Sequence, residues 1–324
     1  MTLRILDRET VRRLLTYEAA IPLMREAMRA LSAGRTRQAL RQIVPLGDGR
    51  MFGVMPGAAE EVFGAKLISV FPENFAKGRQ SHQGGVLLFD PGDGAPVALV
   101  HAGEITAIRT AAASAAATDA LARAGASTLA LLGYGEQALT HARAMVHVRP
   151  VTEIRVWGRS AERAAKSAAA LQAELRLPAR AAATAREAVA GADLICAVSG
   201  ASEPILAGSD VMDGAHVNLV GASTAAVREA DDALVARGRF YADHREGVLR
   251  QGGEILHAIA AGVIGEDHVL GEIGAVMAGT LAGRLSEADV TIYKSLGAIA
   301  QDLAAGWFVY RRAAQAGMGT EAPF

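Results

Sequence analysis

The segment that most constrains the fold of this 324-residue chain is TLALLGYGEQALTHARAM, residues 128–145. An apolar run typical of a buried strand leads into a glycine turn, and the turn opens a helical pattern. The turn fits the pattern G-x-G-x-x-A. Its first glycine permits a tight turn, its second lets the backbone approach a pyrophosphate, and its alanine lets the helix pack closely on the strand. The six positions are Gly133, Tyr134, Gly135, Glu136, Gln137 and Ala138.

The helix that follows this turn would present N–H groups and the positive end of its dipole to phosphates. A second strand-like run, EIRVWGR at residues 153–159, lies at the distance that a βαβ unit requires. The pattern therefore predicts a Rossmann dinucleotide-binding domain. A glycine-rich turn that binds nothing is the alternative.

The remaining patterns divide the chain into two domains. Residues 38–101 carry five short apolar runs broken by glycine and proline, which predict a sheet, and DPGDGAP at 90–96 predicts a hairpin. Residues 103–125 predict a long alanine-rich helix, and 18–33 and 295–317 predict further helices. Between them ADLICAV, AHVNLVG and RFYAD alternate with helical segments, which indicates a parallel sheet. We expect one domain of residues 1–117 with 301–324 and a Rossmann domain of residues 118–300.

Composition excludes several classes of protein. Hydrophobic residues make up 51% and charged residues 21% of the chain, and the net charge of −1 offers no basic field for nucleic acid. The single cysteine, Cys196, excludes an intramolecular disulfide and a multi-cysteine metal site, and we interpret it as a small buried hydrophobe. The eight histidines form no metal-ligand pattern. Without a secretory signal or an apolar run of about 20 residues, we expect a cytoplasmic protein with no membrane segment.

The end of the second Rossmann strand bears on the choice of dinucleotide. An NAD site usually places a carboxylate there to hold the ribose hydroxyls. This chain has Arg159 and Ser160 instead, which would hold a 2′-phosphate. We therefore favour NADP(H), with NAD(H) possible. In the alternative, Arg159 is a solvated residue at the start of a helix.

Three cations of the first domain lie in apolar runs: Arg41 in ALRQIVP, Lys66 in GAKLISVF, and Arg109 in the alanine-rich helix. A buried cation needs an anionic partner. A small substrate carboxylate is one such partner, and a lysine in a dry pocket can give or take a proton near neutral pH. An internal salt bridge or a solvated side-chain tip is the alternative for each cation.

Other polar residues are weaker candidates. His82 lies in a glycine-flanked loop and faces either substrate or solvent. Glu104 and Glu254 are candidate site carboxylates, with surface or helix-capping roles as the alternative.

Five segments together resemble the ornithine cyclodeaminase/mu-crystallin family: GAKLISVFPEN, GVLLFDPGDGAPVALVHAGEITAIRTAAASA, GYGEQALTHARA, VWGRS and VTIYKSLGAIAQDLAA. The resemblance implies an α/β protein with a Rossmann domain and an α+β domain for substrate binding and dimerisation, assembled as a homodimer. It implies that Arg41, Lys66 and Arg109 contact the substrate carboxylate or the reacting centre. It places Thr110 and Ser295 with the cofactor-binding residues, Ser295 near the nicotinamide, and VWGRS resembles NADPH-binding members.

One position departs from the cyclodeaminases of that family. They carry an aspartate just after the glycine of a late Rossmann strand, where this chain has Ser223 in VGAS. A serine does not act as a carboxylate base, which favours the ketimine reductases. The resemblance thus implies NAD(P)H-dependent reduction of pyrroline-2-carboxylate or piperideine-2-carboxylate to the cyclic L-amino acid, with Lys66 and Ser223 at the imine.

Two other functions remain open. One is oxidation of an amino acid, as in an ornithine cyclodeaminase or an amino-acid dehydrogenase. The other is NADPH-dependent binding of a small ligand, as in mu-crystallin-type proteins.

Overall fold

A computed structural model of the protein describes residues 2–324, and of residues 75 and 76 it describes the backbone alone. The chain forms two compact units: unit 1, which comprises the residues up to Arg109 together with Ala298–Phe324, and unit 2, Thr110–Gly297. Among the described residues, no helix combines the length and the hydropathy needed to cross a bilayer.

Unit 1 is built on one mixed sheet. Its strand order is β16-β1-β7-β6-β5-β4-β2, with β3 paired to β4, and all pairs are antiparallel except β1 with β7. The strands are β1 (Thr2–Leu6), β2 (Arg37–Gln38), β3 (Gln42–Gly47), β4 (Arg50–Ala58), β5 (Phe63–Val70), β6 (His82–Phe89), β7 (Pro96–His101) and β16 (Thr320–Pro323).

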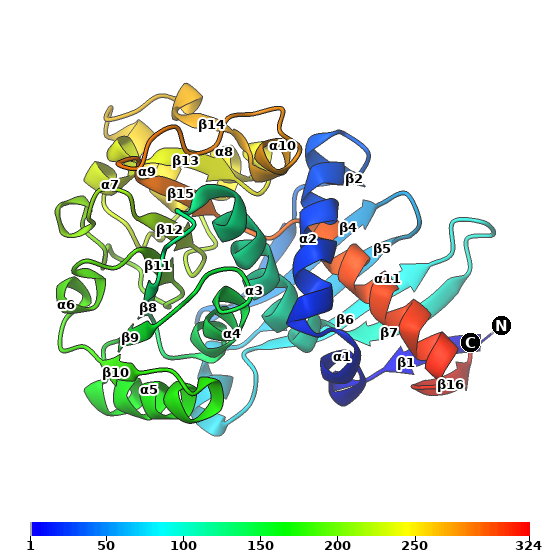
Figure 1. Ribbon diagram of the computed structural model, residues 1–324. Coiled ribbons are helices and arrows are strands. Elements are labelled where there is room, and N and C mark those ends of the chain that lie inside the picture. Colours follow the sequence, from blue (N-terminus) through cyan, green and yellow to red (C-terminus); the bar gives the residue numbers. More distant parts are fainter. Residues whose placement is uncertain (1) are drawn as a thin grey trace. The chain divides into compact units, whose positions relative to one another are not determined.

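Helices cover one face of this sheet. Figure 1 shows α2 (Tyr17–Ser32) and α11 (Ile299–Ala316) side by side in front of the strands, and α11 contacts β4, β5 and β6. Helix α1 (Arg8–Leu14), the short helix η1 (Pro72–Lys77) and the start of α3 (Ala102–Leu121) complete the unit.

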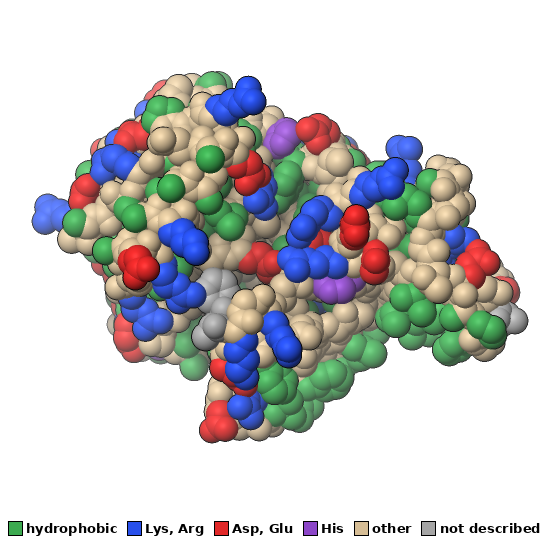
Figure 2. Space-filling view, turned by 90° about the horizontal axis from the view of Figure 1, so that it is seen from below, with side chains coloured by type: hydrophobic (Ala, Val, Ile, Leu, Met, Phe, Trp, Pro, Cys, Tyr) green, Lys and Arg blue, Asp and Glu red, His purple; other side chains and the backbone are tan. Residues whose placement is uncertain are grey.

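The other face of the sheet, called the open face below, carries apolar side chains that are exposed to solvent. The pairing registers place five of them on that face, each between 36% and 52% exposed: Ile5, Val44, Phe52, Leu67 and Leu99. Figure 2, which views the molecule from below, shows hydrophobic side chains gathered along its lower edge. Contiguous exposed apolar surface of this kind marks an interaction face.

Unit 2 contains a wholly parallel sheet in the order β10-β9-β8-β11-β12-β15-β13-β14. The four residues of β11, of β12 and of β15 are all buried, as expected for strands covered on both faces. The order reverses between β8 and β11, and ligands of such sheets bind beyond the carboxyl ends of the strands at this reversal.

The strands of unit 2 are β8 (Thr128–Leu132), β9 (Glu153–Trp157), β10 (Ala179–Ala181), β11 (Leu194–Ala197), β12 (His216–Leu219), β13 (Arg239–Ala242), β14 (Val269–Glu272) and β15 (Thr291–Lys294). Its helices, besides the rest of α3, are α4 (Glu136–Met145), α5 (Ala161–Leu175), α6 (Ala185–Val189), α7 (Asp232–Arg237), α8 (Arg245–Gln251), α9 (Gly253–Ala260) and α10 (Ile273–Met277), with short helices η2 (Gly208–Asp210) and η3 (Glu266–His268).

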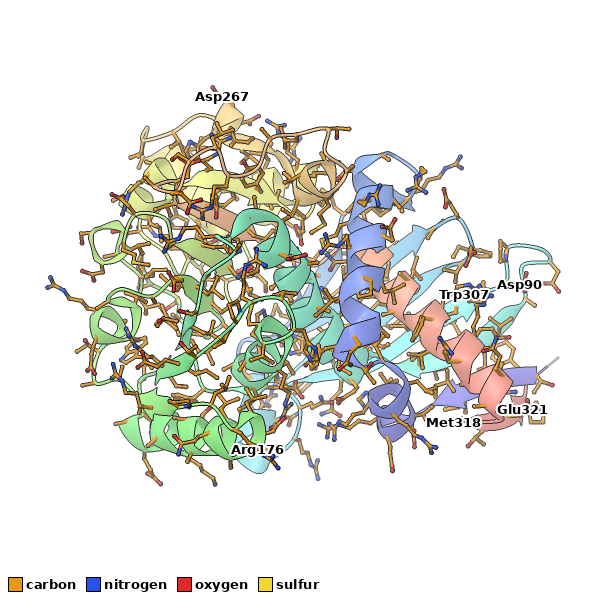
Figure 3. All side chains as sticks on the ribbon, in the orientation of Figure 1. Asp90, Arg176, Asp267, Trp307, Met318 and Glu321 are labelled. Atoms are coloured by element: carbon orange, nitrogen blue, oxygen red, sulfur yellow. The ribbon has the colours of Figure 1, made fainter. Side chains whose placement is uncertain are left out.

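Most of the predicted elements are confirmed, including the Rossmann strand–turn–helix, the parallel sheet, and α2, α3 and α11. The predicted hairpin joins β6 to β7, and Figure 3 marks Asp90 at its tip. There the Asp90 carboxylate accepts the N–H of Gly92 at 2.7 Å. Cys196 is fully buried in β11, as expected of a small hydrophobe, and burial raises the pKa of its thiol to about 12.

Candidate active site

A buried cluster of charges lies in unit 1 beneath α11. Side chains alternate between the faces of β5, and Lys66 falls on the face that the helices cover. There the carboxylate Oδ1 of Asp302 accepts hydrogen bonds from Lys66 Nζ at 3.0 Å and from Arg109 Nε at 3.1 Å. Lys66 and Arg109 are 3% and 4% exposed and Asp302 is fully buried, so water screens these charges little.

The cluster carries more positive than negative charge. Two cations share one carboxylate, and Arg41 is near enough for its charge to act on Lys66. Among the described residues, Asp302 Oδ2 and Gln301 Nε2 are buried without a hydrogen-bond partner, whereas Gln301 Oε1 accepts from Arg109 at 2.8 Å. Because a buried excess of charge is costly, the cluster favours a small anion that also offers acceptors.

Burial changes the acidity of Lys66. The pKa of its ammonium is lowered to about 8: desolvation by burial lowers it most, the charges of Arg109 and Arg41 also lower it, and Asp302 acts in the opposite direction. An ammonium with this pKa can donate a proton near neutral pH and becomes neutral just above it.

The other candidates of unit 1 lie as follows. Arg41 is half-buried between β2 and β3. His82, predicted to lie in a loop, is instead the first residue of β6, where it pairs with Val70 of β5, and it is exposed with its Nδ1 3.0 Å from Ser81 Oγ. Glu104 is buried at the start of α3, where it binds Arg8 at 2.9 Å and Arg12 at 3.0 Å. Glu104 is therefore neither a surface residue nor a helix cap, the two alternatives considered for it, but a buried ion-pair partner that joins α3 to α1.

The glycine turn of unit 2 begins at the carboxyl end of β8, beside the reversal of strand order. Gly133 has φ +137°, and a Cβ there would lie 2.7 Å from the carbonyl oxygen of Val198, the residue after β11. A residue with a side chain would be strained by this φ and would clash with this carbonyl, so the position requires glycine. The backbone therefore passes close to the edge where a dinucleotide would bind.

The helix after this turn suits a pyrophosphate. Gly135 is the N-cap of α4 and has no side chain to cap the first turn, which begins with Glu136. Gln137 Oε1 is buried without a hydrogen-bond partner in the described part of the chain, and Ala138 is fully buried. A close backbone, an uncapped helix start and an unpartnered polar atom together fit a nicotinamide dinucleotide.

The residues considered for the 2′-phosphate lie after β9. Arg159 is exposed, and Ser160 is the N-cap of α5, where its Oγ accepts from Arg163 N at 3.3 Å.

The last three candidates also lie in unit 2. Thr110 is buried in α3, Ser223 is half-buried in the loop after β12, and Ser295 follows β15. Ser295 is buried, and its Oγ has no hydrogen-bond partner among the described residues.

Two residues that complete the unit 1 cluster, Gln301 and Asp302, were not identified from the sequence. Lys66 and Arg109 were singled out as cations in apolar runs, and each requires an anion. Asp302 carries the corresponding signal, because it is the one charged residue in the start of α11, IAQDLAA, whose other residues are apolar except for Gln301. The internal ion pair considered as an alternative for the two cations is therefore present. The single carboxylate of Asp302 balances only one of the two positive charges of Lys66 and Arg109.

Glu254 proves to be fully buried rather than a surface or capping residue, and it pairs with Lys294 Nζ at 2.7 Å. In the described part of the chain, no three His, Cys, Asp or Glu residues gather in a way that could hold a metal ion.

Comparison with known proteins gives consistent likenesses. Over residues 2–317 the chain matches the sequence model of the ornithine cyclodeaminase/mu-crystallin family. Ketimine reductase mu-crystallin of Mus musculus is 39% identical over 280 residues, which cover 86% of this chain and 85% of the relative.

Two solved structures share the whole architecture. That of Thermococcus litoralis Delta(1)-pyrroline-2-carboxylate reductase in complex with NADH and L-proline has a TM-score of 0.95 and 32% identity, and the match covers 98% of this chain and 99% of that one. An archaeal alanine dehydrogenase dimer with bound NAD has a TM-score of 0.94 and 27% identity, with full coverage of both chains. On these matches, the chain belongs to the ornithine cyclodeaminase/mu-crystallin family.

Proposed function

We propose that the protein reduces a cyclic ketimine carboxylate, pyrroline-2-carboxylate or piperideine-2-carboxylate, to the cyclic L-amino acid with NAD(P)H. The observation that carries this proposal is the buried cluster of Lys66, Arg109 and Asp302, in which two cations share one carboxylate. The names of the relatives, a ketimine reductase and a pyrroline-2-carboxylate reductase, support the same reaction.

The substrate carboxylate binds to the positive excess of this cluster. Arg109 already donates Nε to Asp302 and Nη1 to Gln301, which fixes the plane of its guanidinium. A fixed guanidinium loses little entropy on binding a carboxylate. Arg41, whose charge acts on the same cluster, supplies the second cation for this anion.

Lys66 supplies the proton. Reduction adds a hydride to the imine carbon and a proton to the imine nitrogen, so that C=N becomes CH–NH. Lys66 protonates the nitrogen from its ammonium, since its pKa of about 8 lies near neutral pH. Ser223 orients the nitrogen through its hydroxyl.

The residues of unit 2 hold the dinucleotide, which supplies the hydride when bound. Gly133, Gly135 and the first turn of α4 take the pyrophosphate. We further propose a preference for NADP(H), in which the exposed Arg159 and the hydroxyl of Ser160 take the 2′-phosphate. Thr110, Gln137 and Ser295 contact the cofactor, and the last two bring buried polar atoms that lack a partner among the described residues.

We also propose that unit 1 is the substrate and dimerisation domain and that two copies join through the open face of its sheet. Five apolar side chains stand exposed on that face, and sheets pack face to face through such residues. The dimeric alanine dehydrogenase that resembles this chain supports a homodimer.

Oxidation of an amino acid is the second candidate, because the same site catalyses both directions and a relative is an alanine dehydrogenase. Ser223 argues against ornithine cyclisation, since a hydroxyl does not hold an ammonium as an aspartate does. The third candidate, a protein that only binds a small apolar ligand, is disfavoured because the buried charges of the unit 1 cluster do not suit an apolar ligand.

A substrate panel tests the function. NADPH and NADH oxidation is followed at 340 nm with pyrroline-2-carboxylate and piperideine-2-carboxylate, and ammonia release is measured from ornithine with catalytic NAD. Rapid imine reduction that favours NADPH, without ammonia release, is expected. Ammonia release without imine reduction would overturn the proposal in favour of a cyclodeaminase.

A further inference from the structure

A second group of buried charges lies in unit 2, where Glu229 adjoins the pair of Glu254 and Lys294. Glu229, fully buried, accepts four hydrogen bonds from the loops that follow β11 and β12. Its Oε1 accepts the N–H and the hydroxyl of Ser199, both at 2.7 Å. Its Oε2 accepts the N–H of Gly221 at 2.7 Å and that of Ala222 at 3.2 Å. One carboxylate thus joins two loops at the carboxyl edge of the parallel sheet.

Ala222 is held from its other side as well. Lys294 Nζ, at the end of β15, donates to the carbonyl oxygen of Ala222 at 2.6 Å and pairs with Glu254 at 2.7 Å. Glu254 in turn accepts the N–H of Glu229 at 3.2 Å. Three buried charged residues therefore fix both peptide groups of Ala222, the residue that precedes Ser223.

The charge state of Glu229 follows from its partners. Both of its oxygens accept from N–H groups, so neither can carry a proton without losing an acceptor position. Burial raises the pKa of Glu229, and the neighbouring charge of Glu254 also raises it, while Ser199 and Lys294 act against that rise. The ionised form is the one that all four donors match.

We propose that Glu229, with Lys294 and Glu254, is a positioning residue that holds Ser223 and Ser295 in the geometry required at the nicotinamide end of the dinucleotide. Ser223 follows Ala222 directly, and Ser295 follows Lys294 directly. This inference rests on the proposed function in one respect: it takes these two serines to be cofactor or substrate contacts. Each serine is one peptide away from a group that the three charges fix.

The substitution Glu229→Gln tests this role, because it keeps the shape of the side chain and removes one acceptor. The amide must turn its NH₂ toward either Ser199 or the Gly221–Ala222 peptides, where N–H groups already point. One loop is then released. Displacement of a reacting group by about 1 Å can lower the rate about 100-fold, so we expect kcat to fall about 10- to 100-fold.

Asp193→Asn is the matched control. Asp193 also accepts two backbone N–H groups, from Ser127 at 2.9 Å and Thr128 at 3.1 Å, but it precedes β11 at the amino edge of the same sheet. We expect Asp193→Asn to lower the stability of unit 2 without displacing the loops at the carboxyl edge of the sheet. Ser199→Ala serves as a milder second variant, which removes the hydroxyl donor to Glu229 and leaves the three backbone N–H donors in place.

Three quantities are measured for each variant: kcat, the fluorescence emission of bound NADPH, and the Kd of 2′-phospho-ADP-ribose, which lacks the nicotinamide (NADH and ADP-ribose replace these if the wild type prefers them). We expect Glu229→Gln to lower kcat and shift the emission of the bound nicotinamide, with the Kd of the nicotinamide-free ligand within about twofold of wild type. Ser199→Ala should shift both in the same direction by less, and Asp193→Asn should change neither.

Normal kcat and emission in folded Glu229→Gln would overturn the inference. So would a parallel loss of nicotinamide-free ligand binding, because it would show damage to the whole unit. If Glu229→Gln does not fold, Ser199→Ala decides between the same outcomes. If the wild type reduces no imine, the proposed function fails, while the emission and Kd comparison still tests the inference.

Discussion

Lys66 shows how a single residue acquires chemistry from its surroundings. The residue is one position in a strand whose neighbours are apolar, and alternation turns it toward α11 rather than toward the open face. Asp302 keeps the ammonium in place, while burial makes it a much stronger acid than an exposed lysine. Position and acidity are therefore set by different neighbours.

The acidity of Lys66 predicts a pH dependence. Below about pH 8 the side chain is an ammonium, and above it the proton is lost, so a step that needs the proton slows as the pH rises. We expect kcat/KM for pyrroline-2-carboxylate to fall above about pH 8, roughly tenfold per pH unit. Initial rates across pH 6 to about 10 with a saturating dinucleotide measure this.

Lys66→Arg is the control for that profile, since a guanidinium keeps its proton throughout the range. The variant should be slower at neutral pH and should lack the alkaline fall. An unchanged alkaline fall in the variant would assign the titration to another group and remove Lys66 as the proton donor.

At the scale of single residues, the sequence identified the buried cations but did not identify the carboxylate that pairs with them. Lys66 and Arg109 are visible because a charge interrupts an apolar pattern. Asp302 lies more than 190 positions from both. No periodicity reports a contact over that distance, and only the folded sheet and α11 bring the three together.

The strand–turn–helix of residues 128–145 is the element on which cofactor binding depends. Its first glycine satisfies two constraints at once, a left-handed φ and the nearby carbonyl of Val198. The motif was recognisable in the sequence because both constraints require glycine at this position.

Gly133→Ala is expected to disable this element. The added Cβ meets backbone rather than a movable side chain, at a φ that costs about 1 to 3 kcal/mol for a non-glycine residue. We expect a lower Tm and a Kd for NADPH at least about tenfold weaker, because relief of the clash shifts the turn away from the pyrophosphate. Calorimetry and thermal unfolding measure the two effects.

Gly125→Ala is the matched control, since a Cβ there meets nothing within 4 Å. It should leave both quantities near wild type. Gly133→Ala with normal NADPH affinity would show that the turn is not the pyrophosphate site.

Other strands were not predicted from the sequence, because they are short or lie at the ends of the chain. β15, TIYK, is four residues long and buried on both faces, so it shows no alternation. The strands β10 and β14 have three and four residues. The strands β1 and β16 lie at the two ends of the chain, where β16 pairs only with β1 and β1 also pairs with β7. Long elements with a clear period, such as α2 and α11, were predicted closely.

At the scale of the whole molecule, the chain divides at Arg109/Thr110 and Gly297/Ala298, whereas composition suggested 117/118 and 300/301. The first division falls inside α3, which runs from Ala102 to Leu121 without a break. A continuous helix carries no proline, glycine or polar linker at the boundary. Its position therefore depends on tertiary contacts that composition does not report.

The open face of the unit 1 sheet predicts a dimer. We expect light scattering to give twice the chain mass of 33.6 kDa. The double variant Phe52→Glu/Leu99→Glu, which places charges on that face, should give the monomer mass. Val263→Glu, at an exposed apolar residue of unit 2, should remain dimeric. A dimer that survives the double variant would place the interface elsewhere.

The central claim is that the buried cations of unit 1 bind the carboxylate of a cyclic imine that is then reduced. The most direct measurement compares kcat/KM for pyrroline-2-carboxylate with that for 1-pyrroline, which lacks the carboxylate, in the wild type and in Arg109→Met. We predict that the wild type prefers the carboxylate by about 100-fold or more and that Arg109→Met loses most of this preference, mainly through the carboxylate substrate. Equal preference in the two proteins, or a wild type that does not distinguish the substrates, would contradict the account.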